Sequence, residues 1–282
     1  MAEWSKALVL KTSVRSAYRG FESHSHRHYK KWIVQDKSMK KLLLYIIVVF
    51  FSFYSNVLAF KEDHLNNLLN NKDCMQCDFS GANLSDIKLQ NIDISGSNFK
   101  NSILKYSSFE NVNLSNVNLS FANMENVSIR ESILKGSNLQ GAILVDSNIK
   151  DVDLSNSILT KIVMVDAILN EVNLSNSDLE NANLVFTNFK NVKLNKVNFQ
   201  YANLSDTIFY NTILYTVNLK NTSLRNSNFN YSTIINSDLS YADLSNAIFS
   251  RTSIRESNCI GCLLVETDFT SAKIVNMNFD KK

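Results

Sequence analysis

The side chains best suited to chemistry are four cysteines, arranged as two Cys-x-x-Cys pairs, Cys74/Cys77 and Cys259/Cys262. Four thiolates at one point could hold a zinc ion, and a single pair could work as a redox dithiol. A reactive sulfur atom must also be accessible to its partner. The choice between these uses therefore depends on the fold that positions each pair.

Other reactive groups are sparse. His64 is the single histidine after residue 38, and the sequence offers it no partner for a catalytic triad or a metal site, so we interpret it as an exposed polar residue. Asp86, Asp146, Asp166 and Asp206 recur at multiples of twenty residues, which favours a solvated outer face over a ladder of calcium sites. The sequence thus predicts no enzyme activity, no cofactor and no metal site.

The first 28 residues show no hydrophobic periodicity and resemble the translation of a serine tRNA gene. Residues 8–13 can be encoded by an anticodon arm, residues 19–24 by the stem and loop that follow, and Arg27-His28 by the terminal CCA. We therefore predict that Met39 is the true start, and that residues 1–38 are a mis-assigned and disordered leader.

Residues 39–59 have the three regions of a secretory signal peptide. Lys40 and Lys41 precede an uncharged apolar stretch over residues 42–53, and Val57 and Ala59 stand at the small-residue positions of a cleavage site. We expect cleavage after Ala59 and a location in the periplasm or outside the cell. The alternative is an uncleaved membrane anchor over residues 42–59, whose length just reaches the roughly 17–25 residues of a spanning helix.

A period of five residues dominates the rest of the chain. From Phe79 to Phe279 every fifth residue is large and apolar, with Cys259 as the small exception, and a small or β-branched residue stands two positions before nearly every one. Residues twenty apart give one run of phenylalanines in particular, at 189, 209, 229, 249 and 269. Neither the helical period of 3.6 nor the strand period of 2.0 fits this pattern.

The repeats Ala-Asn-Leu-Ser-Asp at 82–86, Ala-Asn-Leu-Val-Phe at 182–186 and Ala-Asp-Leu-Ser-Asn at 242–246 resemble the pentapeptide-repeat family. The resemblance covers residues 74–279. It implies an all-β fold, a right-handed quadrilateral β-helix with four pentapeptides per coil and about ten coils, here over residues 74–282. Residues 60–73, with Leu65, Leu68 and Leu69 at helical spacing, are expected to form a short helix that caps the first coil.

This fold separates the two cysteine pairs. Cys77 and Cys259 would lie about nine coils apart, roughly 43 Å at the strand spacing, which excludes a shared zinc ion. Each pair must act alone, and in an exported protein local disulfides are expected. Buried free thiols and a redox dithiol are the alternatives. The cysteines at 74 and 77 also resemble the cysteine-flanked start of exported family members.

Charge bears on the choice of function. The chain has a formal net charge of +3, yet residues 60–282 alone carry a net charge of −4. This mildly negative charge argues against a nucleic-acid partner. We therefore predict a non-enzymatic scaffold or protein-binding module of the bacterial envelope or exterior. The alternative is an inhibitor of a topoisomerase that imitates DNA, as some family members do. That role needs a dense negative surface, which outward lysines such as Lys88, Lys105 and Lys190 oppose.

Two groups of apolar or aromatic residues stand at outward positions, where Asn, Ser, Lys, Asp and Glu are the rule. The first candidate surface for a protein or glycan partner comprises Tyr210, Ile213, Tyr215, Tyr231, Ile235, Arg251 and Arg255. The second, an apolar strip, comprises Ile143, Val145, Val163, Val165, Val185 and Phe186, for which strand preference is an equal explanation. A second copy of the chain could pair at the C-terminal coil, and a membrane contact is expected only through an uncleaved signal segment.

Overall fold

The computed structural model describes residues 62–279. The predictions for residues 1–38 and for the signal segment at 39–59, including the resemblance of residues 1–28 to a tRNA gene, lie outside the described residues. Within residues 62–279, no helix is long and apolar enough to cross a membrane.

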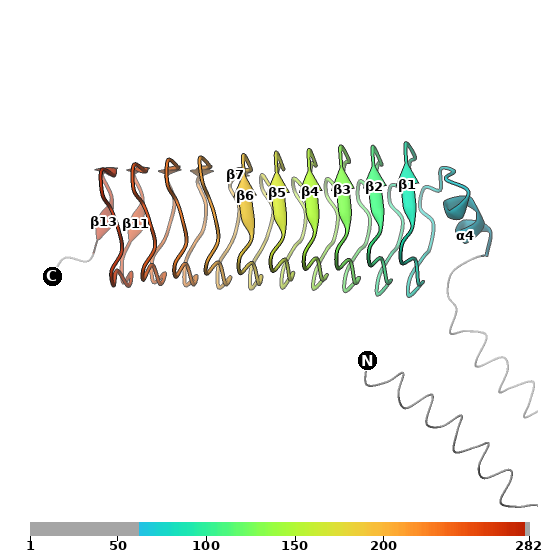
Figure 1. The fold of residues 1–282 in the computed structure, drawn as a ribbon, viewed down its shortest axis with the longest axis horizontal. Coiled ribbons are helices and arrows are strands. Elements are labelled where there is room, and N and C mark those ends of the chain that lie inside the picture. Colours follow the sequence, from blue (N-terminus) through green and yellow to red (C-terminus); the bar gives the residue numbers. More distant parts are fainter. Residues whose placement is uncertain (1–61, 280–282) are drawn as a thin grey trace, which may run out of the picture. The chain divides into compact units, whose positions relative to one another are not determined.

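After a short helix, the described chain winds into a parallel β-solenoid of about ten coils (Figure 1). Each strand pairs in parallel with the strand twenty residues later, as in Leu89↔Phe109 and Ile254↔Ile274. The elements are α4 (Glu62–Leu69), β1 (Lys88–Gln90), β2 (Ser108–Glu110), β3 (Ser128–Arg130), β4 (Asn148–Lys150), β5 (Ile168–Asn170), β6 (Asn188–Lys190), β7 (Lys193–Asn195), β8 (Ile213–Tyr215), β9 (Thr233–Ile235), β10 (Ser253–Arg255), β11 (Asn258–Cys259), β12 (Lys273–Val275) and β13 (Asn278–Phe279). The predicted fold class is confirmed.

The strands occupy different sides of the solenoid in its two halves. Strands β1 to β6 form one sheet along one side, whereas β7, β8, β9, β10 and β12 form a second sheet along the adjacent side. The change falls between β6, which ends at Lys190, and β7, which begins at Lys193. Isolated parallel bridges continue the ladder on the remaining sides, so the backbone groups of neighbouring coils pair along the length of the solenoid.

The core is a stack of identical layers. The large residue of each repeat is fully buried through most of the solenoid, and the small residue two positions earlier is buried beside it. The rings of Phe189, Phe209, Phe229 and Phe249 stack with centroids 4.8, 4.6 and 4.7 Å apart, and Phe269 follows at 5.2 Å. This ladder follows the spacing of the coils and is the one that the sequence predicts.

Many of the buried hydroxyl groups at the small position make a recurrent hydrogen bond, although those of Ser102 and Ser147 have no partner among the described residues. Ser137 donates to the carbonyl oxygen of Leu114 at 2.9 Å, and Thr212 donates to that of Phe189, also at 2.9 Å. The separation is 23 residues in both cases, so the hydroxyl reaches the backbone of the preceding coil. Since an unpaired buried hydroxyl would be costly, this bond explains why serine and threonine can replace alanine inside the solenoid.

Each repeat turns a corner at the second residue after the large one, which has a positive φ throughout the solenoid. Asn, Asp and Gly tolerate this left-handed conformation, and they hold most of the corners. Where the outward residue before the large one is Asp or Asn, its side chain often accepts a hydrogen bond from the backbone amide two residues later, as at Asp78 and Asn113. At Asp243 burial raises the pKa of the carboxyl group, but hydrogen bonds from Ser245 and the nearby Arg225 outweigh burial and hold the pKa below its usual value.

The two ends of the described solenoid differ. Helix α4 lies over the first coil and buries Leu68 completely, with Leu65 half-buried beside it (Figure 1). In the last described coil Ile274 and Phe279 are each 38 % exposed, whereas Ile254, one coil earlier, is fully buried. The pairing of two copies at this coil stays a prediction.

Candidate docking surface

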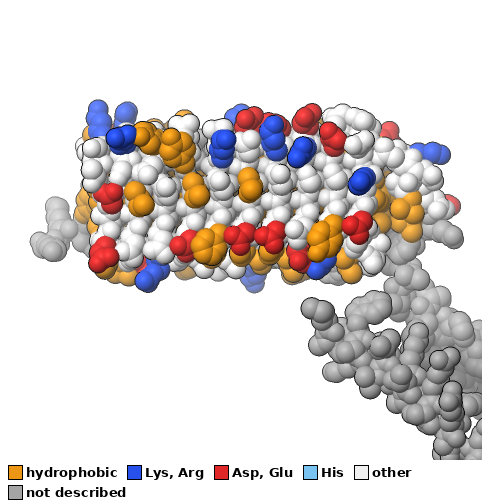
Figure 2. Space-filling model, in the orientation of Figure 1, with side chains coloured by type: hydrophobic (Ala, Val, Ile, Leu, Met, Phe, Trp, Pro, Cys, Tyr) orange, Lys and Arg blue, Asp and Glu red, His pale blue; other side chains and the backbone are white. Residues whose placement is uncertain are grey.

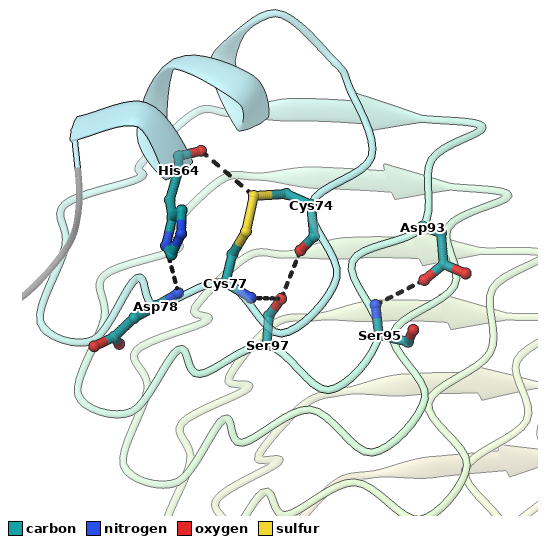
Figure 3. The surroundings of a disulfide bond; sticks show 7 residues. All are labelled: His64, Cys74, Cys77, Asp78, Asp93, Ser95 and Ser97. Carbon is teal, nitrogen blue, oxygen red and sulfur yellow. Dashed lines mark hydrogen bonds between the residues drawn. A yellow bond between two sulfur atoms is a disulfide. The ribbon is translucent and has the colours of Figure 1, made fainter.

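The structure contains both cysteine pairs as local disulfides, Cys74–Cys77 and Cys259–Cys262, with Cα atoms 5.6 and 5.3 Å apart. Cys74, Cys77 and Cys259 are buried, and Cys262 is half-buried. The Ser97 hydroxyl, from the next coil, donates to the carbonyl oxygen of Cys74 and accepts from the Cys77 amide (Figure 3). Each disulfide therefore joins two consecutive repeats of one coil. Cys74–Cys77 lies in the first coil, and Cys259–Cys262 lies in the penultimate coil. Among the described residues, no cluster of His, Cys, Asp and Glu could hold a metal ion.

His64 has a structural contact that sequence reasoning missed. Its ring is half-buried, and Nδ1 accepts a hydrogen bond of 3.0 Å from the amide of Asp78 (Figure 3). The ring also lies edge-on to Phe79, with centroids 6.3 Å apart. His64 thus joins α4 to the first coil. No sequence signal places the side chain there, because the helix and the coil meet only in the fold.

Three residues of the first candidate surface meet at a corner between two sides of the solenoid. The guanidinium carbon of Arg251 lies 5.3 Å from the centroid of the Tyr231 ring, and the Arg251 guanidinium donates a hydrogen bond to the Tyr231 hydroxyl. The ring of Tyr210 stands edge-on to Tyr231 at 5.4 Å. Tyr210 and Tyr231 are 50 % and 46 % exposed, so the group presents aromatic faces to solvent. A cation over an exposed ring gains about 0.5–1 kcal/mol, which orders this corner.

The other four residues lie on the outer face of the second sheet. Tyr215 on β8, Ile235 on β9 and Arg255 on β10 are register neighbours in consecutive coils. Ile213 begins β8 and points outward beside Tyr215, with 59 % of its side chain exposed. The structure thus places the predicted residues in two adjacent groups, one at the corner and one on the sheet, separated by the buried position that follows each corner.

The charges of this surface are free to act on a partner. Neither Arg251 nor Arg255 forms an ion pair with any residue between 62 and 279. The Arg255 side chain makes one hydrogen bond, from Nε to the Ser253 hydroxyl at 3.2 Å. Two exposed guanidinium groups among tyrosines and isoleucines have the composition of interface hot spots. We call the seven residues the Tyr210–Arg255 surface.

The second candidate, the apolar strip, is less exposed. Ile143 and Val163 pair across neighbouring coils, and the next residue in the same ladder is the polar Asn183. Val145, Val163, Val165 and Val185 are half-buried, so Phe186, at a corner, is the most exposed member. Val163 lies at a bridged strand position, where β-propensity alone would favour valine, whereas Val145, Val165 and Val185 lie in turns. The strip therefore offers a partner less surface than the tyrosines do.

Comparison with known proteins agrees with the fold. The family model for pentapeptide repeats in eight copies matches overlapping segments that cover residues 67–195 and residues 247–281, and a pentapeptide repeat region matches 184–259. No curated protein matches the sequence.

Among solved structures, HetL, a pentapeptide repeat protein involved in heterocyst differentiation regulation from the cyanobacterium Nostoc sp. strain PCC 7120, is 21% identical. The match covers 74% of this chain and 92% of HetL, with a TM-score of 0.67. QnrB1, a plasmid-mediated fluoroquinolone resistance protein, is 16% identical over 71% of this chain and 94% of its own, with a TM-score of 0.28. A pentapeptide repeat protein of the Arabidopsis thaliana thylakoid lumen is 22% identical over 45% and 72%, with a TM-score of 0.27. Because the family models match its repeats over more than half of its length, the chain belongs to the pentapeptide-repeat family.

Proposed function

We propose that this protein is a non-enzymatic binding protein, and that the Tyr210–Arg255 surface holds its partner, a protein or a glycan. The observation that carries the proposal is the row of Tyr215, Ile235 and Arg255 on a rigid sheet, in which Tyr215 and Arg255 are exposed and Ile235 is half-buried. Tyr and Arg are the residue types that contribute most at interfaces, and a sheet holds them in place before binding. Pentapeptide-repeat proteins are in general structural or binding modules rather than catalysts.

We further propose that the protein works in the bacterial envelope or outside the cell. The basic, apolar and small-residue regions of 39–59 support export, and the two local disulfides suit an oxidising compartment. Retention through an uncleaved segment at 42–59 is the alternative. In either case the solenoid would meet its partner outside the cytoplasm.

Replacement of Tyr215→Ala together with Arg255→Ala tests the docking surface. Both side chains are exposed, so the β-type circular dichroism should stay unchanged. Capture of the native partner from the exported fraction should weaken at least about tenfold, because the double variant removes the aromatic and cationic contacts.

A matched control replaces the same residue types elsewhere. Tyr201→Ala with Arg225→Ala also removes one exposed tyrosine and one exposed arginine, from other sides of the solenoid. It should leave capture intact. Capture that survives in the Tyr215/Arg255 variant would move the site to the apolar strip or to the last coil.

A further inference from the structure

The side of the solenoid that carries the second sheet is divided by charge. It consists of six residues in each coil, which run from one corner to the next. These are residues 91–96 in the first coil, and the equivalent residues every twenty positions up to 271–276 in the last. We call it the bipolar side. Its first five coils hold five acidic residues and one lysine, for a net charge of −4, and its last five hold five basic residues and one glutamate, for a net charge of +4. The acidic half comprises Asp93, Glu131, Asp151, Asp153 and Glu171 with Lys135, and the basic half comprises Lys193, Lys196, Arg251, Arg255 and Lys273 with Glu256.

These charges lie at the surface and are little compensated within the described chain. All twelve side chains are exposed or half-buried. Within residues 62–279, the ion pair of this side is Lys150–Asp151 at 3.4 Å, made with a lysine of the adjacent side, and no ion pair joins the two halves. In Figure 2 the acidic side chains of the upper edge lie in the half nearer α4, and hydrophobic side chains gather on that edge toward the other end.

Side-chain size is divided in the same way. The outward position that follows the buried large residue holds Ser95, Ser115, Ser155 and Ser175 in the acidic half, interrupted by Lys135. In the basic half the same position holds Tyr215, Ile235, Arg255 and Val275 after Asn195. Along this row of outward positions, the acidic half therefore carries mostly short side chains, whereas the basic half carries mostly larger side chains that project from the surface. Charge and relief are complementary between the halves of one molecule.

A two-fold rotation matches the halves of two copies. An axis that lies in the contact plane and perpendicular to the solenoid turns one copy antiparallel to the other and places each basic half on the partner's acidic half. The rotation keeps the position across the side unchanged, so a corner meets the same corner of the other copy. Arg251 of one copy then faces the row of corner residues that includes Glu131, Asp151 and Glu171 in the acidic half of the other copy.

The size of this side suits a stable contact. Ten coils at about 4.8 Å extend roughly 50 Å, and five residues across at about 3.3 Å give roughly 16 Å. The product is on the order of 800 Å² on each copy, which matches the area that each partner buries in a typical specific interface.

We propose that the bipolar side binds a second copy of this chain, antiparallel and related by a two-fold axis, with the basic half of each copy on the acidic half of the other. The proposal rests on the proposed function, because it names a second copy as one partner of the sheet that carries Tyr215 and Arg255. Electrostatic attraction between exposed charges is screened by salt, so the association depends on ionic strength.

Charge reversal in both halves tests the proposal by sedimentation velocity on the full chain. The unaltered protein should dimerise at 50 mM salt and dissociate at 500 mM salt. A basic-half variant, Lys193→Glu with Arg255→Glu, should dimerise at least tenfold more weakly, and so should an acidic-half variant, Glu131→Lys with Glu171→Lys. An equimolar mixture of the two variants should form a heterodimer more tightly than either variant dimerises alone. In the heterodimer the unaltered acidic half of one variant meets the unaltered basic half of the other, and the two altered halves, which carry no net charge, meet each other.

The control reverses two lysines outside the bipolar side, Lys100→Glu with Lys161→Glu, which makes the same change in net charge as the basic-half variant. Its dimer should equal that of the unaltered protein. If neither charge-reversal variant dimerises more weakly than the unaltered protein, the contact lies elsewhere, for example at the last coil. A mixture of the two variants that stays monomeric would overturn the antiparallel arrangement. An unaltered protein that is monomeric at 50 mM salt, yet captures a native partner through Tyr215 and Arg255, would overturn this proposal and leave the proposed function standing.

Discussion

At the scale of single residues, two glycines occupy corners beneath aromatic rings of the preceding coil. A Cβ atom added at Gly141 would lie 2.7 Å from two ring atoms of Phe121, and one added at Gly261 would lie 2.4 Å from the ring of Tyr241. Both glycines have positive φ values. Glycine thus serves twice at these corners, because it permits the left-handed conformation and leaves room for a ring to lie on the backbone.

Gly141→Ala should therefore destabilise the solenoid through strain and through a clash. A left-handed alanine costs about 1–2 kcal/mol, and displacement of the Phe121 ring adds to that cost. Gly81→Ala is the matched control, because its φ of 68° is similar to the 64° of Gly141 but nothing lies within 4 Å of the added Cβ. Denaturation in urea should give a lower midpoint for Gly141→Ala than for Gly81→Ala.

The ring contact can be separated from the backbone strain by a double variant. In the background Phe121→Ala, the further change Gly141→Ala should cost no more than Gly81→Ala does, because the clash is gone. Equal midpoints for Gly141→Ala and Gly81→Ala in the unaltered background would show that the ring moves aside freely.

At the scale of the repeat, the inward and outward positions should respond oppositely to the same substitution. Leu154 is buried and Asn156, two residues later, is an exposed corner with positive φ. Leu154→Lys would place an ammonium group in a dry core without a counter-charge, so soluble yield or the β-type circular dichroism should collapse. Asn156→Lys should cost only the modest strain of a left-handed lysine, a conformation that Lys161 and Lys196 already adopt at corners of this kind. Comparable losses in both variants would contradict the assignment of the two positions.

The structure of the repeat shows which features the sequence can predict and which it cannot. The period of five assigns every inward position, and the spacing of twenty predicts the Phe189 ladder, because a solenoid without insertions converts sequence distance directly into height. It also predicts that Tyr231 lies one coil from Arg251. It does not give the rotamer that brings the Arg251 guanidinium to the Tyr231 hydroxyl, nor the docking of His64, because side-chain rotation and helix placement are not periodic.

The side on which the strands form was also beyond the sequence. The repeats keep the same pattern before and after residue 190, yet the regular sheet passes from one side to the next there. The candidate residues on β8 to β10 were identified as outward positions, but their place on a flat sheet came from the structure.

At the scale of the whole molecule, the redox state reports the compartment. If the protein is exported, both cysteine pairs should be oxidised in protein recovered from the exported fraction. Intact mass before and after labelling with a thiol reagent, without reductant, should show no labelled cysteine. Protein reduced before labelling is the control and should take up four labels, one for each cysteine of the chain. Four labels without reductant would contradict the oxidised state.

The ladder of coils has a mechanical consequence. Within the described solenoid, each coil is hydrogen-bonded to the coil before it and the coil after it, and successive coils repeat every twenty residues. A pulling force applied to the chain would break these contacts one coil at a time, as nearest-neighbour coupling allows. Each event would release about 70 Å of extended chain. The solenoid would therefore lengthen under tension in equal steps and would not rupture as a single unit.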